Sequence, residues 1–174
     1  MDEVTYLVQL LKQNWASASL AAGLPNHQGT PTIIDIRNLD KNKGRRYDLS
    51  QKVEGESSSD LIIVFEDGQD IEYPTISLDV RNETYNMTLH IRCIQDERQQ
   101  GFENFGRDRL NSLYRITRYI IESNRKGSTI THNDESKRFD LITFGTRSES
   151  NDRNKRLFGY KINLTMKKFA ISIP

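Results

Sequence analysis

The sequence has little of what a disulfide-stabilised, membrane-spanning or secreted protein needs. Cys93 is the one cysteine among 174 residues, so no disulfide can form within the chain and the fold does not require an oxidising compartment. No stretch is long and apolar enough to cross a bilayer, and polar residues interrupt the apolar ones near the N-terminus, unlike in a signal peptide. We therefore expect a protein of the cytosol, or of a particle assembled there, with no membrane contact.

An excess of one charge is lacking too. The chain has 25 lysines and arginines against 24 aspartates and glutamates, which gives a formal net charge of +1 at pH 7. This balance provides no general argument for nucleic acid or an anionic membrane as the partner. A local basic segment does occur, made of Lys41, Lys43, Arg45 and Arg46. It could contact phosphates, contact an acidic surface of a partner protein, or keep a loop soluble, and these three interpretations stay open.

Motifs of nucleotide binding and covalent catalysis are also missing. Neither G-x-x-x-x-G-K-[ST] nor G-x-G-x-x-G occurs, and there is no G-x-S-x-G turn that would expose a nucleophilic serine. Cys93 falls on the inward positions of a predicted strand, which indicates a small buried residue and not a reactive thiolate. The three histidines are far apart and lack a second ligand at the spacing of a zinc site. We predict no metal, no cofactor and no enzymatic activity.

The patterns that are present alternate between helix-like and strand-like. Apolar residues at helical spacing predict one helix from about residue 2 to 22 and a second from about 107 to 126. Asp2 and Glu3 suit the positive end of the first helix. Runs of β-branched or alternating residues predict strands at about 31–38, 60–68, 139–146 and 157–166, and near the C-terminus.

Two polar segments, at about 39–60 and 145–156, are predicted to be long loops, and the residues after Phe65 a turn. The order of the elements predicts one α+β domain over residues 1–174. Its sheet should be mixed and mostly antiparallel and contain a long hairpin, with two helices packed on one face.

The stretch Thr75–Glu97 has the clearest strand pattern. Apolar and polar residues alternate on both sides of Asn82–Tyr85, which predicts a hairpin that turns there. In the predicted register three apolar pairs share the inward face: Val80 with Met87, Leu78 with Leu89, and Ile76 with Ile91.

This register also predicts which charged side chains face outward. They should meet solvent or a partner, and they are Asp79, Arg81, His90 and Arg92.

Acidic residues near this hairpin allow a minor alternative. Asp67, Asp70 and Asp79 could supply the oxygen ligands of a small metal-dependent nuclease. Such a site usually includes a lysine that supports the attacking water, whereas Val80 and Arg81 follow Asp79 here. The favoured interpretation is a solvated turn at the end of a strand.

The segment LDVRNETYNMTLHIRCIQDERQQGFENFGRDRLNSLYRITRYIIES resembles the central part of tail terminator proteins of tailed viruses, also called tail completion or neck proteins. The resemblance is one of pattern and extends over most of the chain. The matching pieces, in chain order, are Val4–Trp15, Ile76–Val80, Met87–Cys93, Arg107–Glu122 and Leu157–Met166.

This resemblance implies a non-enzymatic structural protein of the virion tail or neck, assembled in the host cytoplasm. It implies a homo-oligomeric ring, commonly a hexamer, that caps the tail tube and connects it to the neck and head. Partners would be the tail tube protein, neck or connector proteins and the sheath, with non-specific contact to DNA in the lumen. Another head–tail connector or a tail tube subunit is the main alternative. The basic segment and the four outward-facing residues are the candidate interface.

Overall fold

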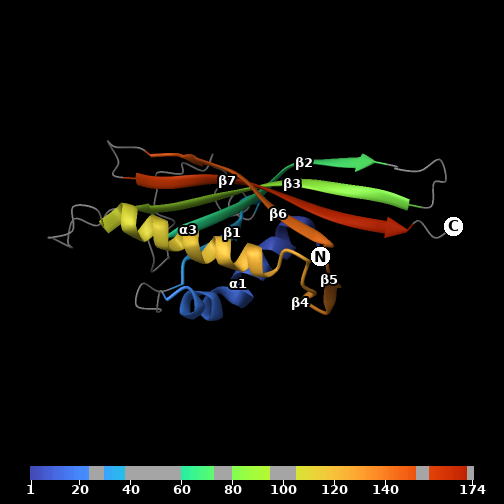
Figure 1. Cartoon of the computed structure of the whole chain (residues 1–174), viewed down its shortest axis with the longest axis horizontal. Helices are drawn as coiled ribbons and strands as arrows, with labels where there is room; N and C mark the ends of the chain where they lie inside the picture. Colours follow the sequence, from blue (N-terminus) through green and yellow to red (C-terminus); the bar gives the residue numbers. More distant parts are fainter. Residues whose placement is uncertain (24–29, 38–59, 73–79, 95–104, 152–156, 172–174) are drawn as a thin grey trace.

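The computed structural model describes residues 1–23, 30–37, 60–72, 80–94, 105–151 and 157–171. These residues form two long helices, one large sheet and one small hairpin (Figure 1). In chain order the elements are α1 (Glu3–Ala21), β1 (Thr32–Asp35), β2 (Leu61–Glu72), β3 (Val80–Ile94), α3 (Phe105–Ser123), β4 (Ile130–His132), β5 (Glu135–Lys137), β6 (Leu141–Glu149) and β7 (Leu157–Ile171).

The large sheet has five strands in the order β1-β2-β3-β7-β6, and β4 pairs with β5 separately. β1 runs parallel to β2, and all other neighbours in the sheet are antiparallel. Both helices pack on the same face of this sheet, and α1 contacts α3 (Figure 1). The arrangement confirms the predicted single α+β domain with a mixed, mostly antiparallel sheet.

The ends of the helices follow from local chemistry. α1 begins after Asp2, whose carboxylate accepts a hydrogen bond from the Thr5 amide (2.7 Å), as an N-cap does. After α3, Gly127 has a φ of 73°, and a side chain there would collide with the carbonyl oxygen of Phe139. No helix within the described ranges is long and apolar enough to cross a membrane.

The core fills the space between the helices and the sheet. Large side chains from both helices are almost completely buried, including Tyr6, Leu7, Leu11 and Trp15 from α1 and Leu110, Ile120 and Ile121 from α3. They pack on alternate residues of the central strands, including Val64, Leu89, Ile91, Ile162 and Leu164. The rings of Tyr6 and Phe139 meet edge to face, with centroids 4.8 Å apart. Burial of each large apolar side chain contributes about 1.5–3 kcal/mol, so this layer dominates the stability.

The predicted register of the hairpin was wrong. Asn82–Tyr85 do not turn but continue β3, which pairs with β2 on one side and β7 on the other. Leu89, for example, lies opposite Val64 and Ile162. The strand continues because Glu83 can be buried: its carboxylate accepts a hydrogen bond from the Tyr85 hydroxyl (2.8 Å). Ile76 and Leu78 lie outside the described residues.

β7 runs without a break to Ile171, through a segment predicted as a separate strand near the C-terminus. β2 and β6 are also longer than the sequence predicts, and each contains a bulge. β2 continues to Glu72 through a predicted turn, with its register shifting between Glu66 and Gly68. β6 continues to Glu149, into the predicted loop at 145–156, with its register shifting between Phe144 and Arg147. An extra residue interrupts the regular alternation, so neither segment reads as a strand from its sequence pattern. The predicted loop at 39–60 lies outside the described residues except for Asp60.

We expect Leu89→Ala to lower the free energy of unfolding by about 2–5 kcal/mol, because the variant leaves a cavity where a completely buried side chain packs. Urea or guanidinium denaturation measures this difference. Leu20→Ala is the matched control, since Leu20 is 68% exposed and its loss should change stability by no more than about 0.5 kcal/mol. Equal effects of the two substitutions would contradict the position of β3 in the core.

Candidate functional site

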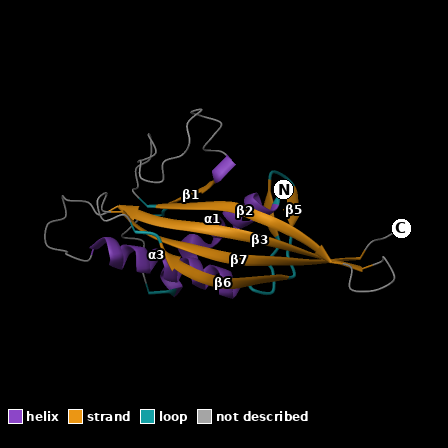
Figure 2. Cartoon of the chain, turned by 90° about the horizontal axis from the view of Figure 1, so that it is seen from above, coloured by secondary structure: helices purple, strands orange, loops and turns teal. Residues whose placement is uncertain are grey.

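The second face of the sheet is polar along its middle and is covered by neither described helix (Figures 1 and 2). Four side chains from four strands form a ladder across it. The Thr88 hydroxyl lies within hydrogen-bond distance of the Asp67 carboxylate and of Asn163 Oδ1. Asn163 in turn donates to the Thr146 hydroxyl (3.1 Å). We call this surface the open face; its ladder supports the sheet without an apolar layer.

Towards β1, the open face becomes apolar. Leu61 and Ile63 are buried there, although neither belongs to the core cluster between helices and sheet. The ring of His90 meets that of Phe65 edge to face at a centroid distance of 5.4 Å. Burial lowers the pKa of His90 and Lys161 lowers it further, while Asp67 acts in the opposite direction. His90 is therefore neutral at physiological pH.

Three of the eight predicted interface residues, Arg81, His90 and Arg92, lie within the described part of the chain. Lys41, Lys43, Arg45, Arg46 and Asp79 lie outside the described residues.

The other three do not form the predicted outward face. His90 and Arg92 lie on the open face, but Arg81 lies on the opposite face and forms an ion pair with Glu83 (2.7 Å). Arg92 is 5% exposed and so does not meet solvent. Both errors follow from the missed continuity of β3: without a turn at 82–85, odd and even residues stay on opposite faces from end to end.

Exposed strand edges were missed by the sequence patterns. β1 ends opposite Val64, so the remainder of β2, from Phe65 to Glu72, has no described strand on its outer side (Figure 2). β6 forms the other edge of the sheet. On β6 the Arg147 guanidinium lies over the rings of Tyr114 and Tyr160, at 4.7 and 4.6 Å from their centroids. The sequence feature that could have indicated the exposed edge of β2 is the charge of residues 65–72, which include four carboxylates and no basic residue.

Acidic side chains on the open face have protein partners. The Asp67 carboxylate accepts from Thr88, and Asp70 accepts from the Asn86 amide (3.2 Å). Within the described ranges, no three histidine, cysteine, aspartate or glutamate side chains are grouped as metal ligands.

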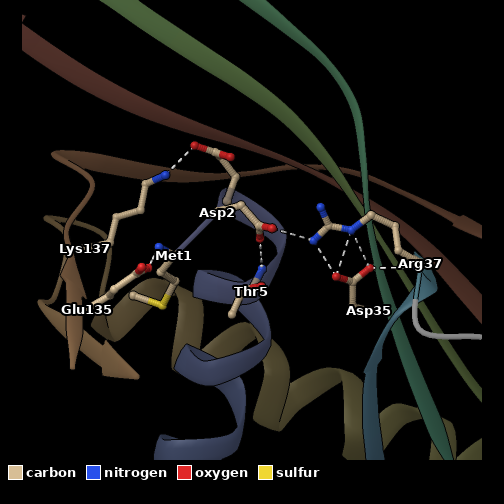
Figure 3. Close-up of polar contacts among 8 residues, drawn as sticks. Met1, Asp2, Thr5, Asp35, Arg37, Glu135 and Lys137 are labelled. Atoms are coloured by element: carbon tan, nitrogen blue, oxygen red, sulfur yellow. Dashed lines mark hydrogen bonds and ion pairs between the residues drawn. The ribbon is translucent and has the colours of Figure 1, made fainter. Parts of the chain in front are cut away.

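A second polar cluster holds the start of α1 (Figure 3). Arg37 forms ion pairs with Asp35 (2.5 Å) and with Asp2 (2.8 Å). The Met1 amino group pairs with Glu135, and Lys137 pairs with Glu3. The cluster thus connects α1 to the end of β1 and to the β4–β5 hairpin. Its role is structural. Its residues are far apart in the chain, so no local sequence pattern indicates it.

Cys93 is completely buried, which confirms the prediction of a small buried residue. Its thiol donates to the carbonyl oxygen of Gly106 (2.9 Å). Burial raises the pKa of Cys93 to about 12, so the thiol is protonated at neutral pH.

We expect Cys93 to react with a thiol reagent such as Ellman's reagent only after unfolding, because both burial and protonation protect it. Absorbance measurements at pH 8, with and without denaturant, test this expectation. Cys93→Ser supplies the baseline. Complete reaction of the native protein at the rate of the denatured protein would contradict a buried thiol.

Replacing Asp2 with alanine should lower the free energy of unfolding at pH 7 by about 1 kcal/mol, because the N-cap hydrogen bond is lost. Burial raises the pKa of Asp2, but hydrogen bonds from Thr5 and Arg37 outweigh it, so the folded-state pKa is lowered. The carboxylate therefore stabilises the fold fully above its unfolded pKa of about 3.9 and loses this effect as pH falls through the folded pKa.

The difference between wild type and Asp2→Ala should accordingly shrink below about pH 4. Urea denaturation at pH 7, 5 and 3 measures it. Asp2→Asn is the matched control, since asparagine also caps helices but does not ionise. A difference that grows on acidification would contradict the lowered pKa.

No protein-family model and no curated protein matches this sequence. The function is therefore inferred from the order of the elements and from the chemistry of the sheet.

Proposed function

We propose that the chain is a structural subunit of a virion that assembles into a ring, acting as the tail terminator that caps the tail tube and connects it to the neck. The proposal rests first on the order of helix, sheet, long hairpin, helix and strand pair, which is the order in tail terminator proteins; here the antiparallel pair β2 and β3 takes the place of the predicted hairpin. A two-helix α+β domain is compatible with that order, but it also occurs in many unrelated proteins. Support from the surface chemistry is therefore needed.

The observation that carries the proposal is the difference between the two edges of the sheet. A ring of identical subunits needs two different complementary surfaces, because each copy meets the next head to tail. One edge here, β2 from Phe65 to Glu72, carries four carboxylates. The other edge, β6, carries an arginine stacked on two tyrosine rings. β6 also carries Glu149, so its edge has no net charge and can meet the acidic β2 edge through Arg147, whereas two β2 edges would repel each other.

The open face adds a second argument. Its described side chains include the exposed Lys161 and Asn163, and its hydrogen-bonded ladder contains the buried Thr88. Such a surface suits a wet contact with tube or neck proteins, or the lining of a lumen, better than burial in an obligate apolar interface. The partners in this proposal are the tail tube protein, neck or connector proteins and the sheath, with the lumen admitting DNA.

We expect the purified protein to form single closed rings, commonly hexamers, and to bind the ends of tail tubes. Native mass spectrometry and negative-stain electron microscopy, without and with tubes, provide the measurement. A protein that stays monomeric both with and without tail tubes would contradict the proposal. Rings that stack spontaneously into long tubes would instead identify a tail tube subunit, because a terminator should stop at one ring.

A further inference from the structure

The free part of β2 is an unusual strand edge. From Glu66 to Glu72 all residues except Gly68 are exposed, and β3 pairs with this segment on one side only. Long exposed edges invite pairing with another strand. Two copies of this edge would bring eight carboxylates together, so like-charge repulsion disfavours self-pairing. The β2 edge should therefore pair with a strand other than β2, and that strand should be basic or neutral.

The outer edge of β6 is also exposed, and it carries an arginine that can bind a carboxylate of β2. Its residues from Gly145 to Glu149 are exposed, and Arg147 has no described carboxylate partner. Stacking on Tyr114 and Tyr160 orients the Arg147 guanidinium and leaves its edge accessible. Arg147 lies on the helix-covered face, because it is opposite Ile162 in the register of β7. Glu66 lies on the same face at the other edge, opposite Met87.

The direction of the two strands and the orientation of their backbone groups also allow β2 of one copy to pair with β6 of another. Three antiparallel pairings separate β2 from β6, so the two run in opposite directions. At the β2 edge the Asp60 carbonyl points outward, since it accepts from the Thr32 amide (3.0 Å). At the β6 edge the Ile142 amide points outward, towards the Arg125 carbonyl (2.9 Å). Because orientation alternates along a strand, residues on the helix-covered face point their backbone groups outward at both edges.

One register places the two bulges opposite each other. If Arg147 is opposite Glu66 of the next copy, the bulge of β6 falls opposite the bulge of β2, and Phe144 and Gln69 then pair on the same face. A shift of two residues one way would put Arg147 opposite Val64, whose outer side β1 occupies. The same shift the other way would put Arg147 opposite Gly68, on the open face.

We propose that β2 of one copy pairs antiparallel with β6 of the next, Phe65–Asp70 against Thr143–Ser148, with Arg147 bound to Glu66 of the neighbour. The contact ends at Thr143 because the Ile142 amide is already bonded. It is heterologous, so it closes into a ring or continues as a filament. This inference deepens the proposed function by naming the surface that joins the subunits, and it rests on that function for the ring.

Charge reversal tests the Arg147–Glu66 pair. Arg147→Glu or Glu66→Arg alone should raise the protein concentration at half-assembly by about tenfold or more, because like charges then face each other. The double variant should restore assembly. An equimolar mixture of the two single variants should also assemble, since alternating copies regain opposite charges at every contact. Lys12→Glu, on the exposed side of α1, is the matched control and should assemble normally. Circular dichroism verifies that each variant is folded.

Cysteine cross-linking separates this inference from the proposed function. Thr143→Cys together with Asp70→Cys should give a ladder of disulfide-linked oligomers, because the register places these residues directly opposite each other at a suitable distance. Each single substitution should give none, and the buried Cys93 does not compete.

The outcomes are distinct. Wild-type rings with no ladder, or single charge variants that assemble normally, would overturn the edge pairing and leave the ring intact. A disulfide-linked dimer from either single cysteine variant would also overturn it, because like edges would then be in contact. A ladder without rings would support the pairing and contradict the ring-forming function.

Discussion

The burial of one face of β3 is the constraint on which the rest of the structure depends. β3 pairs with β2 on one side and with β7 on the other, and β7 follows it over its whole length. Its alternate residues from Tyr85 to Cys93 are each no more than 7% exposed. Because side chains alternate strictly along a strand, burying this row decides which face the helices cover and leaves the other face with Thr88, His90 and the hydrogen-bonded ladder.

The bulges in β2 and β6 have a consequence beyond the shape of the sheet. Each lets its strand continue into a polar segment without moving core residues to the wrong face. β2 thereby extends past the short β1, and β6 extends past the residues that α3 and the turn after it support. Both extensions are exposed edges, one acidic and one with a stacked arginine. The two bulges, which are part of the fold, therefore also create the two exposed edges that the proposed ring requires.

Polar contacts at the start of α1 join elements that the sheet alone would not hold together. Arg37 connects Asp2 with Asp35, and Lys137 connects the β4–β5 hairpin with Glu3 (Figure 3). Lys137 also lies over the rings of Phe139 and Tyr85, 5.3 and 6.0 Å from their centroids. A single exposed ion pair contributes little to stability. The main effect of this cluster is therefore to position α1 and the β4–β5 hairpin relative to β1.

Local patterns in the sequence were sufficient for the α+β class, both helices, most strands and the burial of Cys93, because periodicity and helix caps act over a few residues. They failed at Asn82–Tyr85, where Glu83 is buried with the Tyr85 hydroxyl and the Arg81 guanidinium as its partners. They failed again at Glu66–Gly68 and Phe144–Arg147, where a bulge breaks the alternation. Arg81 was thus assigned to the wrong face, and Arg92 to solvent. Strand partners, faces and free edges depend on contacts between residues far apart in the chain, so only the tertiary structure decided them.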